Sequence, residues 1–203
     1  MGPTGNVFAA DQVDRGPGLL YDRQTTAVGT ATAATYNFFT IPVGGTKTKA
    51  DTNLVQGNRI PPPQAFHAMS LGFYFNPKMT LLDIITFQTN YWMEFKIGIK
   101  VFLEGPLQYY PAGCGLTGFA ATNHATTGLL LATSNGDPNV TARRAFPDFP
   151  RTIPQNVYFG VNVMGTTFTT NASVAAVAGI GAPAYGTIDI LSSIEGVYDR
   201  EVM

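Results

Sequence analysis

The chain of 203 residues is 45 % hydrophobic and 12 % aromatic, with only 12 % charged residues and a net charge of −1. Average soluble domains carry about 25 % charged residues, so a surface this poor in charge is expected to be covered by protein contacts. The balanced charge excludes a global field that would attract nucleic acid or an anionic membrane, and the length suits one domain.

Residues 1–33 carry Gly, Pro, Thr and Ala without a period, which predicts an extended N-terminal arm. The arm lacks the basic charge that would neutralise a genome, because its acidic and basic residues nearly balance: Asp11, Asp14, Asp22, Arg15 and Arg23. It is expected to lie along neighbouring subunits or along its own domain, or to be a free terminus. Neither a cleaved secretory signal nor a transmembrane segment is expected, since no apolar run reaches about 18 residues.

Two strands are expected in the first half of the domain that follows the arm. Residues 35–43 are rich in β-formers and run into Gly44 and Gly45, which predicts an edge strand that ends in a turn. After a polar loop over 46–59, residues 65–75 alternate between apolar and small or polar residues. The predicted buried row of this second strand is Met69, Leu71, Phe73 and Phe75.

The stretch 91–104, YWMEFKIGIKVFLE, shows the strongest pattern in the chain. Apolar residues occupy every second position, which predicts one long central strand with a single dry face. The preceding residues, 79–89, fit both a helical and a strand pattern. We expect a short helix or turn at 78–83, followed by a strand that merges towards Tyr91.

The second half of the chain predicts long loops between further strands. Two short strands are expected at 116–119 and 129–132, and a longer one at 157–163 that the run 166–170 prolongs. The last strand is expected over 185–198, with Ile188, Ile190 and Ile194 facing inward. About eight strands separated by turns predict an all-β fold of two packed antiparallel sheets.

Histidine and cysteine are too sparse to predict a metal or nucleophile site. His67 and His124 are the only histidines, and neither has a histidine two or four residues away, as paired ligands on one strand or helix would. Cys114 is the only cysteine and lies in a tight PAGCG turn, where either histidine could reach it only through the tertiary fold. We interpret it as a structural cysteine, without a disulfide partner in the chain.

Charged and aromatic side chains offer weaker alternatives. A carboxylate pair of the glycosidase kind could come from Asp83, Glu94, Glu104, Asp189 and Glu195, although such residues are more typical of strand faces. The one basic cluster, Arg143, Arg144 and Arg151, is small for a nucleic-acid footprint and equally suits pairing between subunits. Tyr91-Trp92 and Tyr109-Tyr110 could form a sugar-stacking platform or pack in a core or interface. Asn139 and Asn171 match the glycosylation acceptor pattern, which matters only in a secretory pathway.

The overall pattern resembles the single jelly-roll coat proteins of icosahedral viruses. The resemblance lies in the arm over 1–33, about eight strands with long Thr/Ala/Gly loops, few charges and a long strand near the C-terminus. It implies a jelly-roll β-sandwich over 34–203 and a structural virion protein without catalytic, metal or cofactor-binding residues. Such proteins assemble as trimers or pseudo-hexameric capsomers, alone or with other capsid proteins. Because this arm is not basic, the resemblance favours tailless DNA bacteriophages that hold the genome behind an internal membrane.

Two other classes of function are compatible with the pattern. A jelly-roll receptor- or carbohydrate-binding module, such as a trimeric spike or a lectin-like domain, would use the loops 107–127 and 134–155. An enzyme of the cupin or glycosidase kind would need His67, His124 and a carboxylate, or two carboxylates, to converge in space. Because the sequence displays no such cluster, we predict that the protein is not an enzyme.

Overall fold

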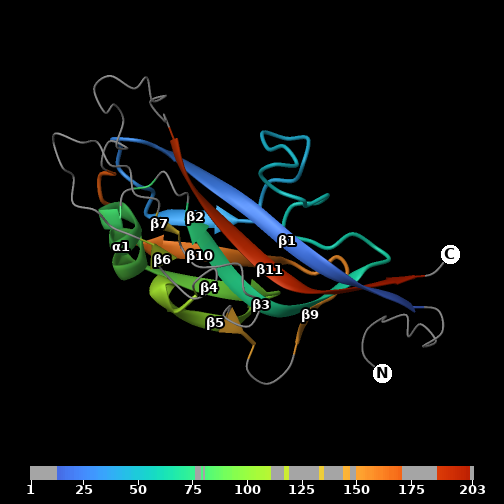
Figure 1. Cartoon of the computed structure of the whole chain (residues 1–203). Coiled ribbons are helices and arrows are strands. Elements are labelled where there is room, and N and C mark those ends of the chain that lie inside the picture. Colours follow the sequence, from blue (N-terminus) through green and yellow to red (C-terminus); the bar gives the residue numbers. More distant parts are fainter. Residues whose placement is uncertain are drawn as a thin grey trace.

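A computed structural model gives the fold of the chain (Figure 1). It describes residues 13–75, 79, 81–110, 117–118, 133–134, 144–146, 150–170 and 187–201. Predictions that concern other residues, including His124, Cys114, Arg143, Asn139 and Asn171, lie outside the described residues.

The first sheet contains both long strands of the molecule. Strand β1 (Val13–Ala27) pairs with β11 (Thr187–Glu201), and β11 pairs on its other side with β3 (Ala65–Phe75). The far edge of β3 is covered by two short strands, β8 (Arg144–Ala145) and β9 (Arg151–Ile153). All of these pairs are antiparallel.

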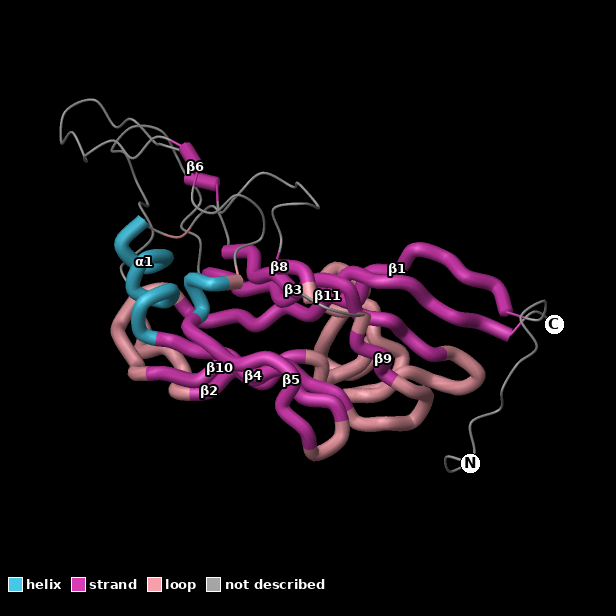
Figure 2. The backbone as a smooth tube through the Cα atoms, turned by 90° about the horizontal axis from the view of Figure 1, so that it is seen from below, coloured by secondary structure: helices cyan, strands magenta, loops and turns pink. Residues whose placement is uncertain are grey.

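The second sheet lies beneath the first, as Figure 2 shows. Its strand order is β2 (Thr35–Phe38), β10 (Phe159–Gly165), β4 (Tyr91–Ile97) and β5 (Lys100–Pro106), again antiparallel throughout. A two-stranded pair, β6 (Thr117–Gly118) with β7 (Thr133–Ser134), and a 3-10 turn, η1 (Leu107–Tyr109), complete the β-rich part. The prediction of an all-β sandwich of two antiparallel sheets is confirmed.

The strand pairs are nested along the chain. The first strand pairs with the last, β2 pairs with β10, β3 pairs with β8 and β9, and β4 pairs with β5 as a hairpin. Successive pairs belong alternately to the first and the second sheet. The path is therefore that of one long antiparallel ribbon that crosses between the sheets at each step.

Aromatic side chains dominate the space between the sheets. Phe73 of the first sheet meets Phe38 of the second edge to face, with ring centroids 5.9 Å apart. The predicted inward row of the last strand is confirmed, since Ile188, Ile190 and Ile194 are all buried. Burial of this apolar area is the main source of stability for such a sandwich.

The stretch 91–104 is a hairpin, so the prediction of one long strand is wrong. The chain turns at Gly98 and Ile99, and Ile97 pairs with Lys100. Gly98 has a φ of +60°, which suits glycine at the first central position of a two-residue hairpin turn. The pattern of apolar residues at every second position continues through the turn, because Gly98 occupies a position where the pattern expects a residue of the polar face. Ile99 consequently stands at the hairpin tip, 98 % exposed.

Helix α1 (Leu81–Asn90) replaces the short helix and strand predicted for 78–90. Ile84 and Phe87 are three residues apart and both buried, so the helix has one apolar face towards the core. The hydroxyls of Thr86 and Thr89 donate to the carbonyls of Leu82 and Ile85, four residues back. Tertiary burial thus overrides the strand preference of the β-branched residues.

The arm predicted for residues 1–33 includes strand β1, which runs along its own domain from Val13 to Ala27. This is one of the arrangements that the sequence left open. The β1–β11 pair forms the long ribbon that extends towards the N and C labels in Figures 1 and 2.

A bulge at Met69 shifts the inward row of β3. Glu195 of β11 is opposite Ser70, whereas the next residue, Gly196, is opposite Ala68, so Met69 is the extra residue. A one-residue shift exchanges the two faces of a strand. Phe66 and Ala68 therefore point inward before the bulge, and Met69, predicted to be buried, is 48 % exposed.

Two other strand ends differ from the prediction. Strand β2 stops at Phe38 because Phe39 has a φ of +67°, which an extended strand cannot accommodate. Strand β10 ends at Gly165, so the run 166–170 does not prolong it. Its predicted inward row is confirmed by the burial of Phe159, Val161 and Val163.

Candidate functional site

The side chains considered for catalysis are dispersed in the structure. No group of three or more His, Cys, Asp or Glu side chains converges within the described parts of the chain. His67 lies on the outer face of β3, where Nδ1 is 2.9 Å from Thr152 Oγ1 and Nε2 is 2.8 Å from Asp199 Oδ2. Arg15 Nε donates to the other oxygen of Asp199 at 3.0 Å. These four residues form a polar row that ties together β1, β11, β3 and β9.

Only two of the five predicted carboxylates are brought together. Glu94 and Glu104 are directly opposite in the β4–β5 pair, and Lys96 forms an ion pair with Glu94. Asp83 is buried in α1, while Asp189 and Glu195 lie on β11 in the other sheet. Of the predicted basic cluster, only the side chain of Arg151 is described, and it stacks over the ring of Phe102, 5.6 Å from its centroid.

The four aromatic residues of the predicted platforms divide into two buried and two exposed. Tyr91 and Tyr110 are buried, whereas Trp92 is 40 % and Tyr109 is 48 % exposed. In β4 this follows from the alternation of the strand, which turns Trp92 outward and Tyr91 inward. Tyr91 is held there by hydroxyl contacts with Thr32 and the carbonyl of Ala33.

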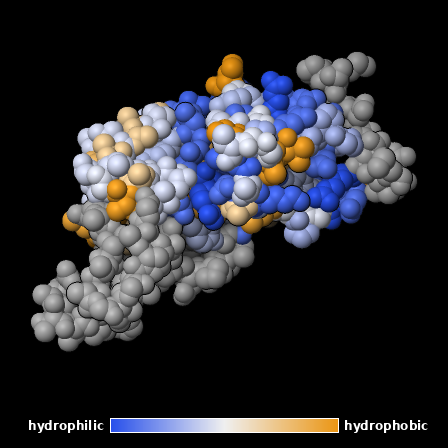
Figure 3. Space-filling view, turned by 90° about the horizontal axis from the view of Figure 1, so that it is seen from above, coloured by the Kyte–Doolittle hydropathy of each residue, from blue (hydrophilic) through white to orange (hydrophobic). Residues whose placement is uncertain are grey.

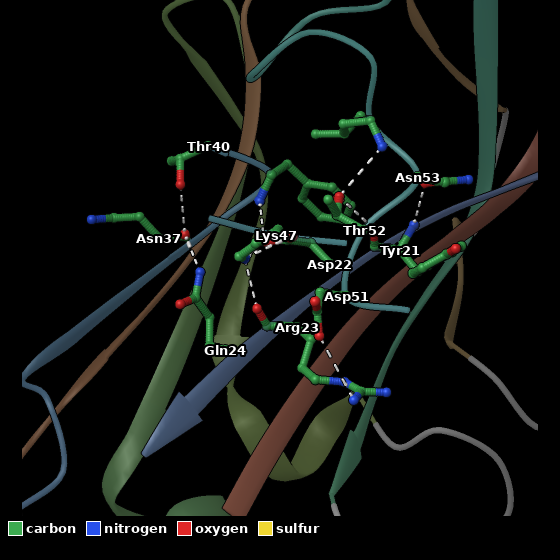
Figure 4. A network of polar contacts seen from close by, with 12 residues as sticks. Tyr21, Asp22, Arg23, Gln24, Asn37, Thr40, Lys47, Asp51, Thr52 and Asn53 are labelled. Carbon is green, nitrogen blue, oxygen red and sulfur yellow. Dashed lines mark hydrogen bonds and ion pairs between the residues drawn. The ribbon is translucent and has the colours of Figure 1, made fainter. Parts of the chain in front are cut away.

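A buried ion pair, which sequence reasoning missed, fixes the loop 46–59 against β1 (Figure 4). Lys47 Nζ donates to both carboxylate oxygens of Asp22, at 2.8 and 2.9 Å, and to the carbonyl of Arg23 at 2.6 Å. The backbone N–H of Phe39 donates to Asp22 Oδ2 at 2.8 Å. Burial raises the pKa of Asp22, although its hydrogen bonds and Lys47 act in the opposite direction. The available signal was its position, since Asp22 follows buried Leu20 on the inward row of β1.

The same loop covers the free edge of β1. Asn53 Oδ1 accepts from the backbone N–H of Tyr21 at 3.1 Å, and the carbonyl of Asp51 accepts from Arg23 N–H at 2.8 Å. Asp51 also accepts from the backbone N–H and the hydroxyl of Thr48, and these hydrogen bonds lower the pKa of Asp51. The loop therefore replaces a missing neighbouring strand at the middle of β1.

Two hollows lie on the outer faces of the sheets. The first, of about 390 Å³, lies over β11 of the first sheet, and its wall includes the loop residues Lys49 and Ala50. Two tyrosines, Tyr21 and Tyr74, and Arg23 contribute to its lining. Arg23 is 3.8 Å from Asp51 and 3.9 Å from Asp189, so its charge is balanced locally.

The second hollow, of about 490 Å³, lies on the second sheet where α1 leads into β4. Its lining combines Trp92 with residues from the end of α1 and from β4 and β5: Thr89, Asn90, Tyr91, Trp92, Glu104, Gly105 and Pro106. An aromatic surface with a few convergent polar groups is the usual composition of a small-ligand site. We treat this Trp92 hollow as the candidate functional site.

Comparisons with known proteins give no family for this chain. No protein-family model, no curated protein and no solved structure matches it.

Proposed function

We propose that the sandwich is a jelly roll and that the protein is a structural subunit of an icosahedral virus shell. The nested pairing of the strands carries this proposal. A jelly roll is a long antiparallel ribbon rolled into two sheets, and viral capsid proteins, lectins and cupins share this architecture. The pairs β1·β11, β2·β10, β3·β8/β9 and β4·β5 in alternate sheets follow such a path.

Since a fold does not assign a function, the surface must discriminate among these classes. A cupin-type enzyme would present a cluster of metal ligands, and the described residues contain none. A coat subunit must instead contact several neighbours, so its apolar contact points should lie on several sides. We therefore propose a structural and not an enzymatic role.

The exposed apolar side chains are distributed in this way. They belong to both sheets, the helix, the hairpin tip and the loops: Leu19, Ile41, Val55, Met69, Leu82, Ile85, Trp92, Ile99, Val101, Tyr109 and Tyr158. On the face seen in Figure 3, apolar side chains stand in separate groups among polar ones. With only 12 % charged residues in the sequence, little desolvation of charge opposes the association of such surfaces.

The proposed partner is therefore the protein itself, as a trimer or pseudo-hexameric capsomer, with or without a second capsid protein. Nucleic-acid binding is not part of the proposal, since the net charge is −1. None of the helices in the described residues is long and apolar enough to cross a membrane. Proximity to an internal virion membrane, as in tailless DNA bacteriophages, would then come through other proteins or lipid contacts.

Self-association is tested by light scattering and negative-stain microscopy of the purified protein across salt and protein concentration. We expect shells, sheets or trimers that associate further as concentration rises. Ile99→Lys should reduce the association because it places a charge on the most exposed of the large apolar side chains among the described residues, and Thr25→Lys, at an exposed position of β1, is the matched control. A wild-type protein that stays monomeric at high concentration would contradict the proposal.

A receptor- or carbohydrate-binding module is the second candidate. The Trp92 hollow favours it, because an exposed indole beside polar side chains suits a sugar ring. This candidate predicts discrete oligomers that bind a glycan, whereas the coat proposal predicts association that continues with concentration.

A further inference from the structure

The only tryptophan of the sequence is placed where it can bind a ligand. Trp92 points outward from β4 between two buried residues, Tyr91 and Met93, and 40 % of it is exposed. Pro106 lies directly opposite in β5, and α1 ends at the neighbouring Asn90. Trp92 is therefore held on a strand pair and forms part of the wall of a 490 Å³ hollow. A rigid element of this kind positions a binding surface more precisely than a loop does.

Polar groups beside the indole are available to a ligand. Glu104 lines the hollow, and its carboxylate forms no hydrogen bond or ion pair with the described residues. The indole N–H of Trp92 likewise has no acceptor within the described part of the chain. The amide of Asn90 has one side-chain contact there, a 3.4 Å approach of the Thr89 hydroxyl to Oδ1. The hollow therefore offers a ligand a hydrogen-bond acceptor at Glu104, a donor at the indole N–H and an amide at Asn90, all near one aromatic ring.

This combination matches the chemistry of a sugar ring. One face of a pyranose presents C–H groups that pack against an indole, while its hydroxyls both donate and accept hydrogen bonds. A carboxylate at Glu104 and an amide at Asn90 complement those hydroxyls. A purely apolar ligand would leave the same groups desolvated without partners, which is costly.

The charged side chains near the hollow favour the binding of some classes of sugar over others. Glu104 is directly opposite Glu94, and Lys96 is paired with Glu94. Two carboxylates against one ammonium disfavour an acidic sugar and favour a neutral or amino sugar, since an aromatic face also attracts cations. We propose that the Trp92 hollow binds a neutral or amino-substituted hexopyranose, a site that does not depend on the proposed self-assembly.

The single tryptophan provides the test, because its fluorescence reports on this site alone. The purified full chain is titrated with methyl glycosides of glucose, galactose and N-acetylglucosamine, with glucosamine, and with glucuronic acid. We expect a saturable change of emission at millimolar concentrations for at least one neutral or amino sugar and none for glucuronic acid. Saturation-transfer NMR measures the same binding without relying on the indole signal.

Substitutions of Trp92 and Glu104 test their contributions to binding separately. Trp92→Ala should weaken binding about tenfold or more, whereas Trp92→Phe should retain most of it. Glu104→Gln should remove any preference for glucosamine over glucose. Tyr158→Ala, at another exposed aromatic residue, is the control and should bind as the wild type does.

Three outcomes of the sugar titrations would overturn the inference: no response to any sugar by either method, binding that survives Trp92→Ala, or glucuronic acid binding as tightly as the neutral sugars. Emission that changes with protein concentration alone would assign Trp92 to a subunit contact and would also overturn it. A failure here leaves the coat proposal intact, because that proposal is tested by the size of the particles.

Discussion

Two segments outside the sheets cover the core of this sandwich, and they do so by different interactions: α1 through aromatic packing, and the loop 46–59 through a buried ion pair. Beneath α1, Phe87 is surrounded by aromatic rings, with centroids 4.8 Å from Phe168, 5.1 Å from Tyr91 and 6.0 Å from both Tyr36 and Phe75. Beneath the loop 46–59, the corresponding place is taken by the carboxylate of Asp22, which is completely buried. One closure depends on contact area and the other on a few directed hydrogen bonds.

The difference predicts different responses to substitution. Apolar contacts are non-directional, so the cost of losing one follows the volume removed. A buried ion pair gains little net stability over an apolar pair, yet removing one partner leaves the other desolvated and uncompensated. Substitutions in the aromatic cluster beneath α1 (the aromatic closure) should therefore lower stability independently of one another. In the polar closure, the effect of replacing Asp22 should depend on whether Lys47 is present.

Truncation of Phe87 is expected to have the largest effect. Phe87→Ala should lower the free energy of unfolding by about 3–5 kcal/mol, because it leaves a cavity among four rings. Urea unfolding followed by circular dichroism measures the loss. Leu82→Ala on the same helix, where the side chain is 62 % exposed, should change stability by less than about 0.5 kcal/mol. Equal losses for the two variants would show that the aromatic cluster around Phe87 does not determine the effect.

Separation of the buried ion pair is expected to be nearly as costly. Lys47→Met should lower the free energy of unfolding by about 3 kcal/mol, since it leaves the Asp22 carboxylate buried without a cation. The double variant Lys47→Met/Asp22→Asn should recover most of that loss, because the introduced amide carries no charge and its oxygen can still accept from Phe39 N–H. Urea unfolding of the single and double variants measures both changes.

The neighbouring lysine provides the control for this cycle. Lys49→Met should leave stability within about 0.5 kcal/mol of the wild type, because no ion pair joins Lys49 to a described residue. If the losses of the two single variants at Lys47 and Asp22 simply add in the double variant, the two side chains act independently and the polar closure is not a unit.

Period-two patterns predicted most of the sheet residues. Strand β3 has the predicted bounds, and Ile188, Ile190 and Ile194 of β11 are buried as expected. The errors arose where one residue changes the register or direction of a strand. Gly98 turns the chain within an unbroken alternation, and Met69 adds a bulge that exchanges the faces of β3. Such events depend on the partner strand, which the local pattern does not contain.

The candidate site could be predicted only in part, for a similar reason. The sequence singled out Trp92, but it paired this residue with Tyr91, which the strand turns to the opposite face. Glu104 was considered for chemistry of another kind, and it lines the same hollow as Trp92 only because β5 folds back on β4. The contact between Asp22 and Lys47 joins residues 25 positions apart, so it required the tertiary structure.

The smallest expected effect is a difference in pH dependence between two aspartates of the polar closure. Burial raises the pKa of Asp22 above 3.8 in the folded protein, so its contribution to stability is greatest below 3.8 and falls as pH rises through the folded pKa. Hydrogen bonds from Thr48 lower the pKa of Asp51, so its contribution is present above 3.8 and is lost as pH falls through its folded pKa.

Opposite slopes should follow when each aspartate is replaced. As the pH falls from neutral towards 3.8, wild type should gain stability relative to Asp22→Asn, and as the pH falls further, below 3.8, it should lose stability relative to Asp51→Asn. Urea unfolding of the three proteins at matched ionic strength measures both differences. Parallel curves for the two variants would mean that the buried carboxylate of Asp22 and the partly exposed carboxylate of Asp51 titrate alike in the folded state, and that burial does not set Asp22 apart.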